Sequence, residues 1–251
     1  MIIRDEQYQQ FQEASRKSFA ESTRIEMAKL FPRHSAQLGE AGMRALVSDG
    51  WNRAAAYGIT SESGVRLYIS LMLGLGNQFD RDFQLPWAGR ILTSGGISAS
   101  DRAFQLNGAA ANYLAQVAGE KGAYINLALE KCLDGWFRTI PASDAREIHT
   151  ETGALLAGLY PRKCAHLKDA GVRKLVARSI ETGAAYGIHR FQGVTQLAAL
   201  KLLLGTHCIK DPLFPWLPAV LNDSAIHSEA ERVERLQEEI MRSLKAWFGE
   251  R

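Results

Sequence analysis

Apolar residues recur at intervals of three and four along much of this chain, the spacing of helices that bury one face. Within residues 35–57 these positions include Leu38, Ala41 and Leu46. A second run, residues 61–76, shows the same spacing and ends at a glycine. Alternating runs of β-branched residues, which are typical of strands, are absent from the sequence. The pattern therefore predicts an all-α fold.

The apolar pattern of residues 31–92 returns in residues 160–221, with corresponding positions 129 apart. Aligned without a gap, 24 of the 62 positions are identical, far more than unrelated segments share. A repeat of this kind indicates duplication of one structural unit. We expect copy one in residues 1–121 and copy two in residues 122–251. Because either copy alone has little material for a core, we expect both to form one compact unit, packed about a pseudo-twofold axis.

Several positions shared by the two copies are typical of helix ends. Gly58 and Gly187 stand where a left-handed helix cap is expected, each followed by an isoleucine that can fold back onto the last turn. A proline at a first helical turn is favourable, because its missing N–H has no partner there. Each copy thus predicts an αα-hairpin followed by a short Pro-Trp helix. The shared structural positions are Tyr57, Gly58, Gly76, Pro86 and Trp87 in copy one, and Tyr186, Gly187, Gly205, Pro215 and Trp216 in copy two.

The segments outside the aligned region also show helical spacing. We expect helices at residues 6–30 and 143–159, leading into each copy, and at residues 100–117 and 225–248, following each Pro-Trp helix. A further helix, residues 123–137, connects the copies. The last of these segments carries one apolar stripe on an otherwise charged surface.

Composition limits the classes of function. Hydrophobic residues make up 46% and charged residues 23% of the chain, which is typical of a globular protein. The net charge is only +3 and no basic run is present, so we expect no nucleic-acid partner. The longest apolar stretch is too short to cross a bilayer, and the first residues lack a signal-peptide pattern. Three widely spaced cysteines without a CxxC motif fit a reduced cytoplasmic protein.

Motifs that carry chemistry are few. The sequence has no HExxH, no GxSxG and no phosphate-binding loop. His207 and Cys208 could be drawn as a dyad, but neighbouring side chains in one loop rarely adopt that geometry. Asp80 and Asp82 form a DxD, yet only Asp82 has a counterpart, Asp211. Turn formation, or capping of the Pro-Trp helix, explains one shared aspartate better than a cation site. We therefore expect a protein that is not an enzyme and that holds no metal or cofactor.

Four arginines are retained in equivalent pairs, Arg33 with Arg162 and Arg44 with Arg173. Packing alone does not require them. They either bind acidic groups and carbonyls within the fold or line a groove that binds a partner.

The string YGIT, then VRLYISLMLGLG, then QFDRDFQLPWAGRIL resembles a family of bacterial helical proteins encoded beside type VI secretion genes for spike, PAAR-type tip and effector proteins. No catalytic residue of that family is carried over. The polar part of the string is present in copy one alone, except for Asp82. Together with the paired arginines it makes up our candidate protein-binding residues, which are Arg33, Arg44, Thr60, Arg66, Tyr68, Asp80, Asp82, Arg162 and Arg173.

This resemblance implies a context of interbacterial antagonism, without a stated activity. Within that context, we expect a cytosolic adaptor or chaperone that helps an effector load onto its PAAR or spike carrier, without enzymatic activity. Its partner would be another protein, such as a secretion effector, a PAAR or spike protein, or a toxin. The alternative is an immunity protein that binds and blocks a cognate toxin. An effector enzyme of unknown activity is a third possibility.

Overall fold

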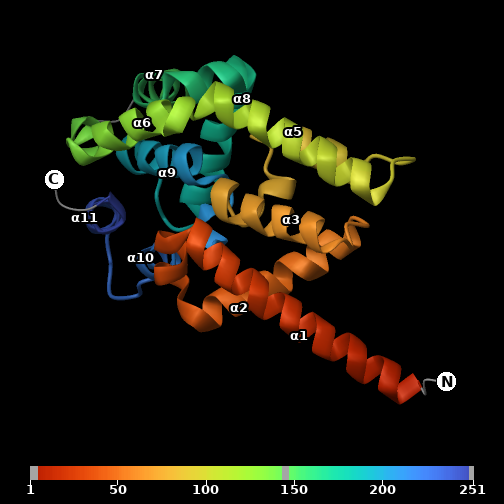
Figure 1. Ribbon diagram of the computed structural model, residues 1–251. Helices are drawn as coiled ribbons and strands as arrows, with labels where there is room; N and C mark the ends of the chain where they lie inside the picture. Colours follow the sequence, from red (N-terminus) through yellow and green to blue (C-terminus); the bar gives the residue numbers. More distant parts are fainter. Residues whose placement is uncertain (1–4, 143–146, 249–251) are drawn as a thin grey trace.

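The computed structural model describes residues 5–142 and 147–248. This part of the chain is helical without a strand, which confirms the predicted all-α class (Figure 1). The helices, with η marking a 3₁₀ helix, are α1 (Asp5–Leu30), α2 (Pro32–Ala56), α3 (Glu62–Leu75), η1 (Phe79–Arg81), α4 (Pro86–Thr93), α5 (Ala99–Val117), η2 (Glu120–Gly122), α6 (Ala123–Leu133), η3 (Trp136–Thr139), α7 (Ile148–Leu159), α8 (Pro161–Ala185), α9 (Phe191–Leu204), η4 (Cys208–Lys210), α10 (Trp216–Leu221) and α11 (Glu229–Phe248).

The helices of the two copies correspond closely. Helices α2, α3 and η1 begin and end 129 residues before α8, α9 and η4. Helices α2 and α8 also bend at equivalent residues, Gly39 and Lys168, where the backbone φ is positive. Each copy therefore contains the predicted αα-hairpin, a 3₁₀ turn and a short helix that starts near the Pro-Trp pair.

The first hairpin turns show why the Tyr-Gly-Ile sequence recurs. After α2, the N–H groups of Gly58 and Ile59 donate to the carbonyls of Ala55 and Ala54, both at 2.9 Å. These two bonds close the last turn of the helix as a Schellman motif, in which Gly58 adopts a φ of 75°. Gly187 and Ile188 repeat the arrangement after α8. The predicted glycine caps are confirmed.

Turn formation, one of the two roles expected for Asp82, is observed: Asp82 accepts from Gln84 N at 2.9 Å in the turn before α4. Asp82 does not cap α4, which begins after Leu85 without a side-chain cap. The predicted start of the last helix is wrong. Helix α11 begins at Glu229 and not at residue 225, because Ser228 accepts from Glu231 N at 3.1 Å and so marks the helix start. Residues 143–146 of the predicted helix 143–159 lie outside the described residues, and α7 begins at Ile148.

One continuous core contains buried residues of both copies. Helix α9 contributes most to it, because its side chains are buried on nearly every side. Helix α1 packs on α2 and α3, where Phe19 contacts Trp51 and Met27 Sδ lies 3.4 Å from Ser70 Oγ, while its N-terminal half extends beyond the rest of the molecule (Figure 1). In the described part of the chain, every helix is too short or too polar to cross a bilayer.

Candidate functional site

Asp80, one of the candidate binding residues, lies in a buried ion pair. Its side chain is 0% exposed, and its Oδ1 lies 2.5 Å from Arg53 Nη2. Tyr57 Oη donates to the other carboxylate oxygen at 2.9 Å. Arg53 Nη1 also donates to Asn77 O at 2.7 Å. Asp80 and Arg53 therefore tie α2 to the loop after α3, and the carboxylate of Asp80 faces the interior.

The other residues of the copy-one signature lie in different environments. Tyr68 is fully buried, and burial raises the pKa of its phenol. Arg66 is half-buried on α3 and reaches across to α1, with its Nε 3.2 Å from Glu26 Oε2. Thr60 is exposed in the turn between α2 and α3. Of these side chains, Thr60 is the one that is open to a partner.

The four paired arginines are exposed, but they do not gather at one place. Arg44 binds Glu40 on its own helix at 2.6 Å and lies 3.8 Å from Glu21 of α1. Arg162 places its guanidinium 4.6 Å from the ring centre of Tyr124 on α6. The structure places Arg33 and Arg173 at the surface as well. None of the four lines the apolar cavity described below.

Asp82 and Asp211 connect the two copies to each other. Asp82 Oδ2 accepts from Thr206 N at 2.7 Å, and Asp211 Oδ2 accepts from Asn77 N at 2.8 Å. Thr206 and Asn77 occupy equivalent positions in the two copies, as do Asp82 and Asp211. The two hydrogen bonds are therefore related by a local two-fold symmetry: each copy donates a backbone N–H to the aspartate of the other. Burial raises the pKa of Asp211, whereas its bonds to backbone N–H groups act in the opposite direction. The pseudo-twofold packing of the whole copies stays a prediction, which this exchange supports.

Helix α5 presents an outer face that carries no charge. Residues 103–119 contain no Asp, Glu, Lys or Arg. The inner face packs on α3, α4 and α8, while Phe104, on the outer face, is 80% exposed. Small exposed residues continue the outer stripe, which we call the α5 face and which consists of Phe104, Gly108, Ala111 and Ala115. An exposed aromatic ring beside small residues, without charge, is typical of a surface that contacts another protein.

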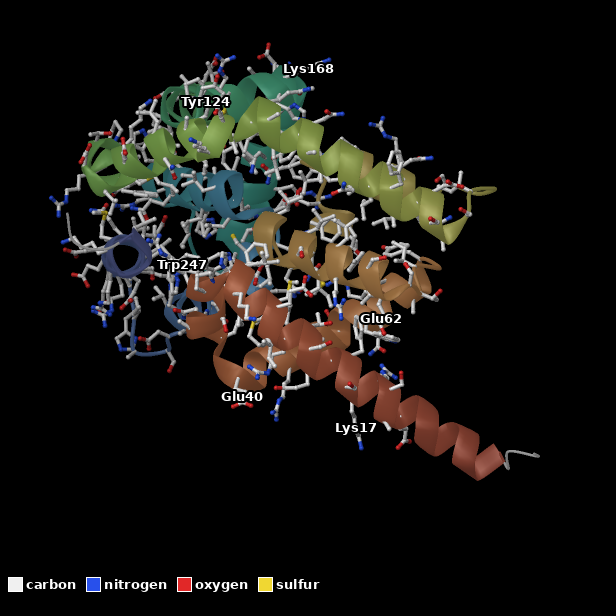
Figure 2. All side chains as sticks on the ribbon, viewed as in Figure 1. Lys17, Glu40, Glu62, Tyr124, Lys168 and Trp247 are labelled. Carbon is white, nitrogen blue, oxygen red and sulfur yellow. The ribbon has the colours of Figure 1, made fainter. Side chains whose placement is uncertain are left out.

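A cavity of about 330 Å³ lies between the two copies. Equivalent residues line it from both sides, namely His34 with Lys163, Leu75 with Leu204, and Leu85 with Phe214. Helices α5, α6 and α11 complete its wall. Trp247 of α11 faces the body of the molecule, and its ring centre lies 4.7 Å from that of His34 (Figure 2). Most of the lining is apolar, as in pockets that hold small ligands.

Lys163 is the charged residue whose position in this cavity needs explanation. It is 8% exposed, and burial lowers its pKa to about 8, although Asp82 opposes the shift. Asp82 already accepts three hydrogen bonds, from Gln84 N, Thr206 N and Thr206 Oγ1. Within the described residues, Lys163 Nζ has no hydrogen bond and no ion pair. Trp216 Nε1 and Gln84 Oε1 are fully buried polar atoms of the lining that find no partner in the described part.

The loop pair His207 and Cys208 lacks the features of an activated nucleophile. Cys208 is buried, and burial raises its pKa to about 12, the opposite of what thiolate chemistry requires. Burial likewise raises the pKa of Cys132 to about 12 and that of Cys164 to about 11. In the described ranges, no group of three or more His, Cys, Asp or Glu side chains is placed to hold a metal ion.

The sequence alone did not lead us to the α5 face or Lys163 as functional candidates, although a feature of the sequence marks each of them. The absence of charge from residues 103–119 is visible in a chain with 23% charged residues. The basic side chains of His34 and Lys163 follow the shared Pro-Arg pair in each copy. Their equivalence gained meaning only when both were found in the lining of one cavity.

No protein-family model matches this chain, and neither a curated protein nor a solved structure shows significant similarity to it.

Proposed function

We propose that this protein is a non-enzymatic adaptor or chaperone of a bacterial type VI secretion system, acting in the cytoplasm. Its partner is an effector or the PAAR or spike protein that carries the effector. The secretion context rests on the resemblance of residues 31–92, and more loosely of residues 160–221, to the family described above. The binding role rests on the surface of the molecule.

The observation that carries the binding role is the α5 face. Phe104 is the most exposed of the large hydrophobic residues in the described part of the chain. Exposing an aromatic ring to water is unfavourable, and burying it in an interface recovers about 25 cal/mol for each Å² covered. The neighbouring Gly108, Ala111 and Ala115 present little bulk, so a partner helix can approach closely. The absence of charge keeps the cost of removing water from this face low.

The remaining candidate residues fit a supporting role. Thr60, Arg33, Arg44 and Arg173 are exposed and can contribute polar contacts. Tyr68 and Asp80 are buried, so they act on binding through the shape of copy one.

The test is copurification from the native host, with partners identified by mass spectrometry. We expect an effector, PAAR or spike protein encoded nearby to copurify with the wild type. Phe104→Asp should reduce its recovery roughly tenfold or more, because the complex would bury an unpaired carboxylate. Leu30→Asp is the matched control, since Leu30 is 60% exposed on α1, away from the α5 face. Equal recovery with Phe104→Asp and wild type would overturn the role of this face.

A second measurement separates the adaptor from the immunity protein. Deletion of an adaptor stops effector delivery and leaves the strain resistant to its own toxins. An immunity protein instead rescues cells that express the neighbouring toxin. Rescue by the wild type, lost in Phe104→Asp, would replace the adaptor role with the immunity role at the same face.

A further inference from the structure

The lining of the cavity between the two copies is mostly apolar and includes the side chains of Lys163 and Asp82. Lys163 lies in the first turn of α8, beside Asp82, while Trp247 and Leu244 of α11 line another part of the wall. Leu75, Leu204 and Phe214 add to the apolar lining. Such a wall binds a ligand that has a polar end and a hydrocarbon body.

The ammonium group of Lys163 determines which polar end fits. Lys163 is 8% exposed, and the described residues supply no hydrogen bond or ion pair to its Nζ, which is not among the fully buried polar atoms and so can accept a ligand as partner. Asp82 cannot serve fully, because its oxygens already bind the backbone at Gln84 and both the backbone and the hydroxyl of Thr206. Trp216 Nε1 is a second unpaired donor in the same lining. Two donors favour an anionic acceptor, and the unpaired Gln84 Oε1 can be satisfied by a water molecule.

We propose that this cavity binds a small amphipathic carboxylate, whose head group accepts a hydrogen bond from Lys163 and whose hydrocarbon chain lies against the apolar wall. The volume of about 330 Å³ sets the length of the chain. This volume lies at the lower end of the range for pockets that bind small ligands, which favours a short or medium hydrocarbon chain. A medium-chain fatty acid has this size.

Sodium decanoate is a suitable probe for calorimetric titration against the full chain, and 1-decanol is the uncharged comparison of equal length. We expect saturable binding of one decanoate per chain and weaker binding of decanol. Lys163→Met should weaken decanoate binding roughly ten- to a hundredfold, the value of a charge-assisted hydrogen bond, and should leave decanol binding nearly unchanged. Lys210→Met is the matched control, because Lys210 is exposed on η4 and does not line the cavity.

A second variant tests the location independently of Lys163. Ser243 of α11 lines the cavity, and Ser243→Leu fills part of it while improving helix propensity. We expect this variant to keep its circular dichroism spectrum and to bind both probes more weakly. The proposal is overturned if decanoate fails to saturate the wild type, if decanol binds as tightly as decanoate, or if neither Lys163→Met nor Ser243→Leu changes the affinity for decanoate.

Discussion

Lys168 adopts the backbone conformation of Gly39, the residue 129 positions before it. Gly39 has φ 64° and ψ −179°, and Lys168 has φ 60° and ψ 171°. Glycine populates this region of backbone φ and ψ freely, whereas a residue with a Cβ is strained there by about 1 to 3 kcal/mol. Copy two thus keeps the bend of copy one with a less suitable residue.

We predict that Lys168→Gly raises the free energy of unfolding by about 1 kcal/mol. The gain is smaller than the strain, because glycine also gives the unfolded chain more freedom. Gly39→Lys should lower the free energy of unfolding by a similar amount; a Cβ built at Gly39 meets no atom within 4 Å, so the cost is conformational. Urea denaturation measures both. Lys168→Ala is the control that keeps the positive φ, and a gain from it equal to that of Lys168→Gly would contradict the explanation.

The exchange of bonds between the copies gives the second prediction. Asp82→Ala and Asp211→Ala should each lower the free energy of unfolding by about 2 to 3 kcal/mol, because each leaves buried backbone N–H groups without acceptors. The loss from Asp82→Ala should be the larger of the two, since both carboxylates accept two equivalent backbone bonds but Asp82 also accepts from Thr206 Oγ1. Asp134→Ala, at an exposed position, serves as the comparison in urea denaturation. A loss under about 0.5 kcal/mol in either variant would show that the exchange does not hold the copies together.

The third prediction concerns the ion pair of Arg53 and Asp80. Arg53→Thr should lower the free energy of unfolding by about 3 kcal/mol, because Asp80 then remains buried with a single hydrogen bond, from Tyr57. Copy two has Thr182 and Ile209 at these positions. The double variant Arg53→Thr with Asp80→Ile should therefore recover part of the loss. A double-mutant cycle that finds the two effects additive would contradict a coupled pair.

The fourth prediction concerns pH. The pKa of Lys163 is lowered from 10.5 to about 8 in the folded protein. Between these values the unfolded chain holds a proton that the folded chain has lost, so Lys163 makes stability rise with pH there. Below pH 8 the folded protein carries the full cost of the buried charge. Lys163→Met should then be more stable than wild type by about 1 to 3 kcal/mol at pH 7, with the advantage disappearing toward pH 10.5.

The comparison with Lys163→Met is needed because other groups titrate near the same pH. The buried thiols of Cys132, Cys164 and Cys208 have raised pKa values, so above pH 9 they lower stability as pH rises. That contribution is present in both proteins and cancels in the difference, apart from the direct influence of Lys163 on Cys164 and Cys208. Urea denaturation at pH 7 and pH 9.5 measures the difference. If Lys163→Met were less stable than wild type at pH 7, the proposed cost of burying the charge of Lys163 would be contradicted.

The sequence by itself determined the helical class, the repeat and the glycine caps. These features are local, because a helix repeats every 3.6 residues and a cap such as Tyr57-Gly58-Ile59 involves bonds within a few residues. Duplication strengthened the prediction, since the same local pattern occurred twice at a fixed spacing. The start of α11 was misplaced by four residues because the segment before it has a helix-like composition but forms a turn at Asp223.

Only the tertiary structure decided which polar residues face the interior. Asp80 and Tyr68 were candidates for binding because they are polar and belong to the signature, yet both are buried. Asp82 was expected to form a turn or to cap the short helix after it, and it also accepts a hydrogen bond from Thr206 N in the other copy. Contacts between residues more than a hundred positions apart depend on how the helices pack, which no local pattern encodes. The same packing brings Lys163 and His34 to one cavity and leaves Phe104 in solvent.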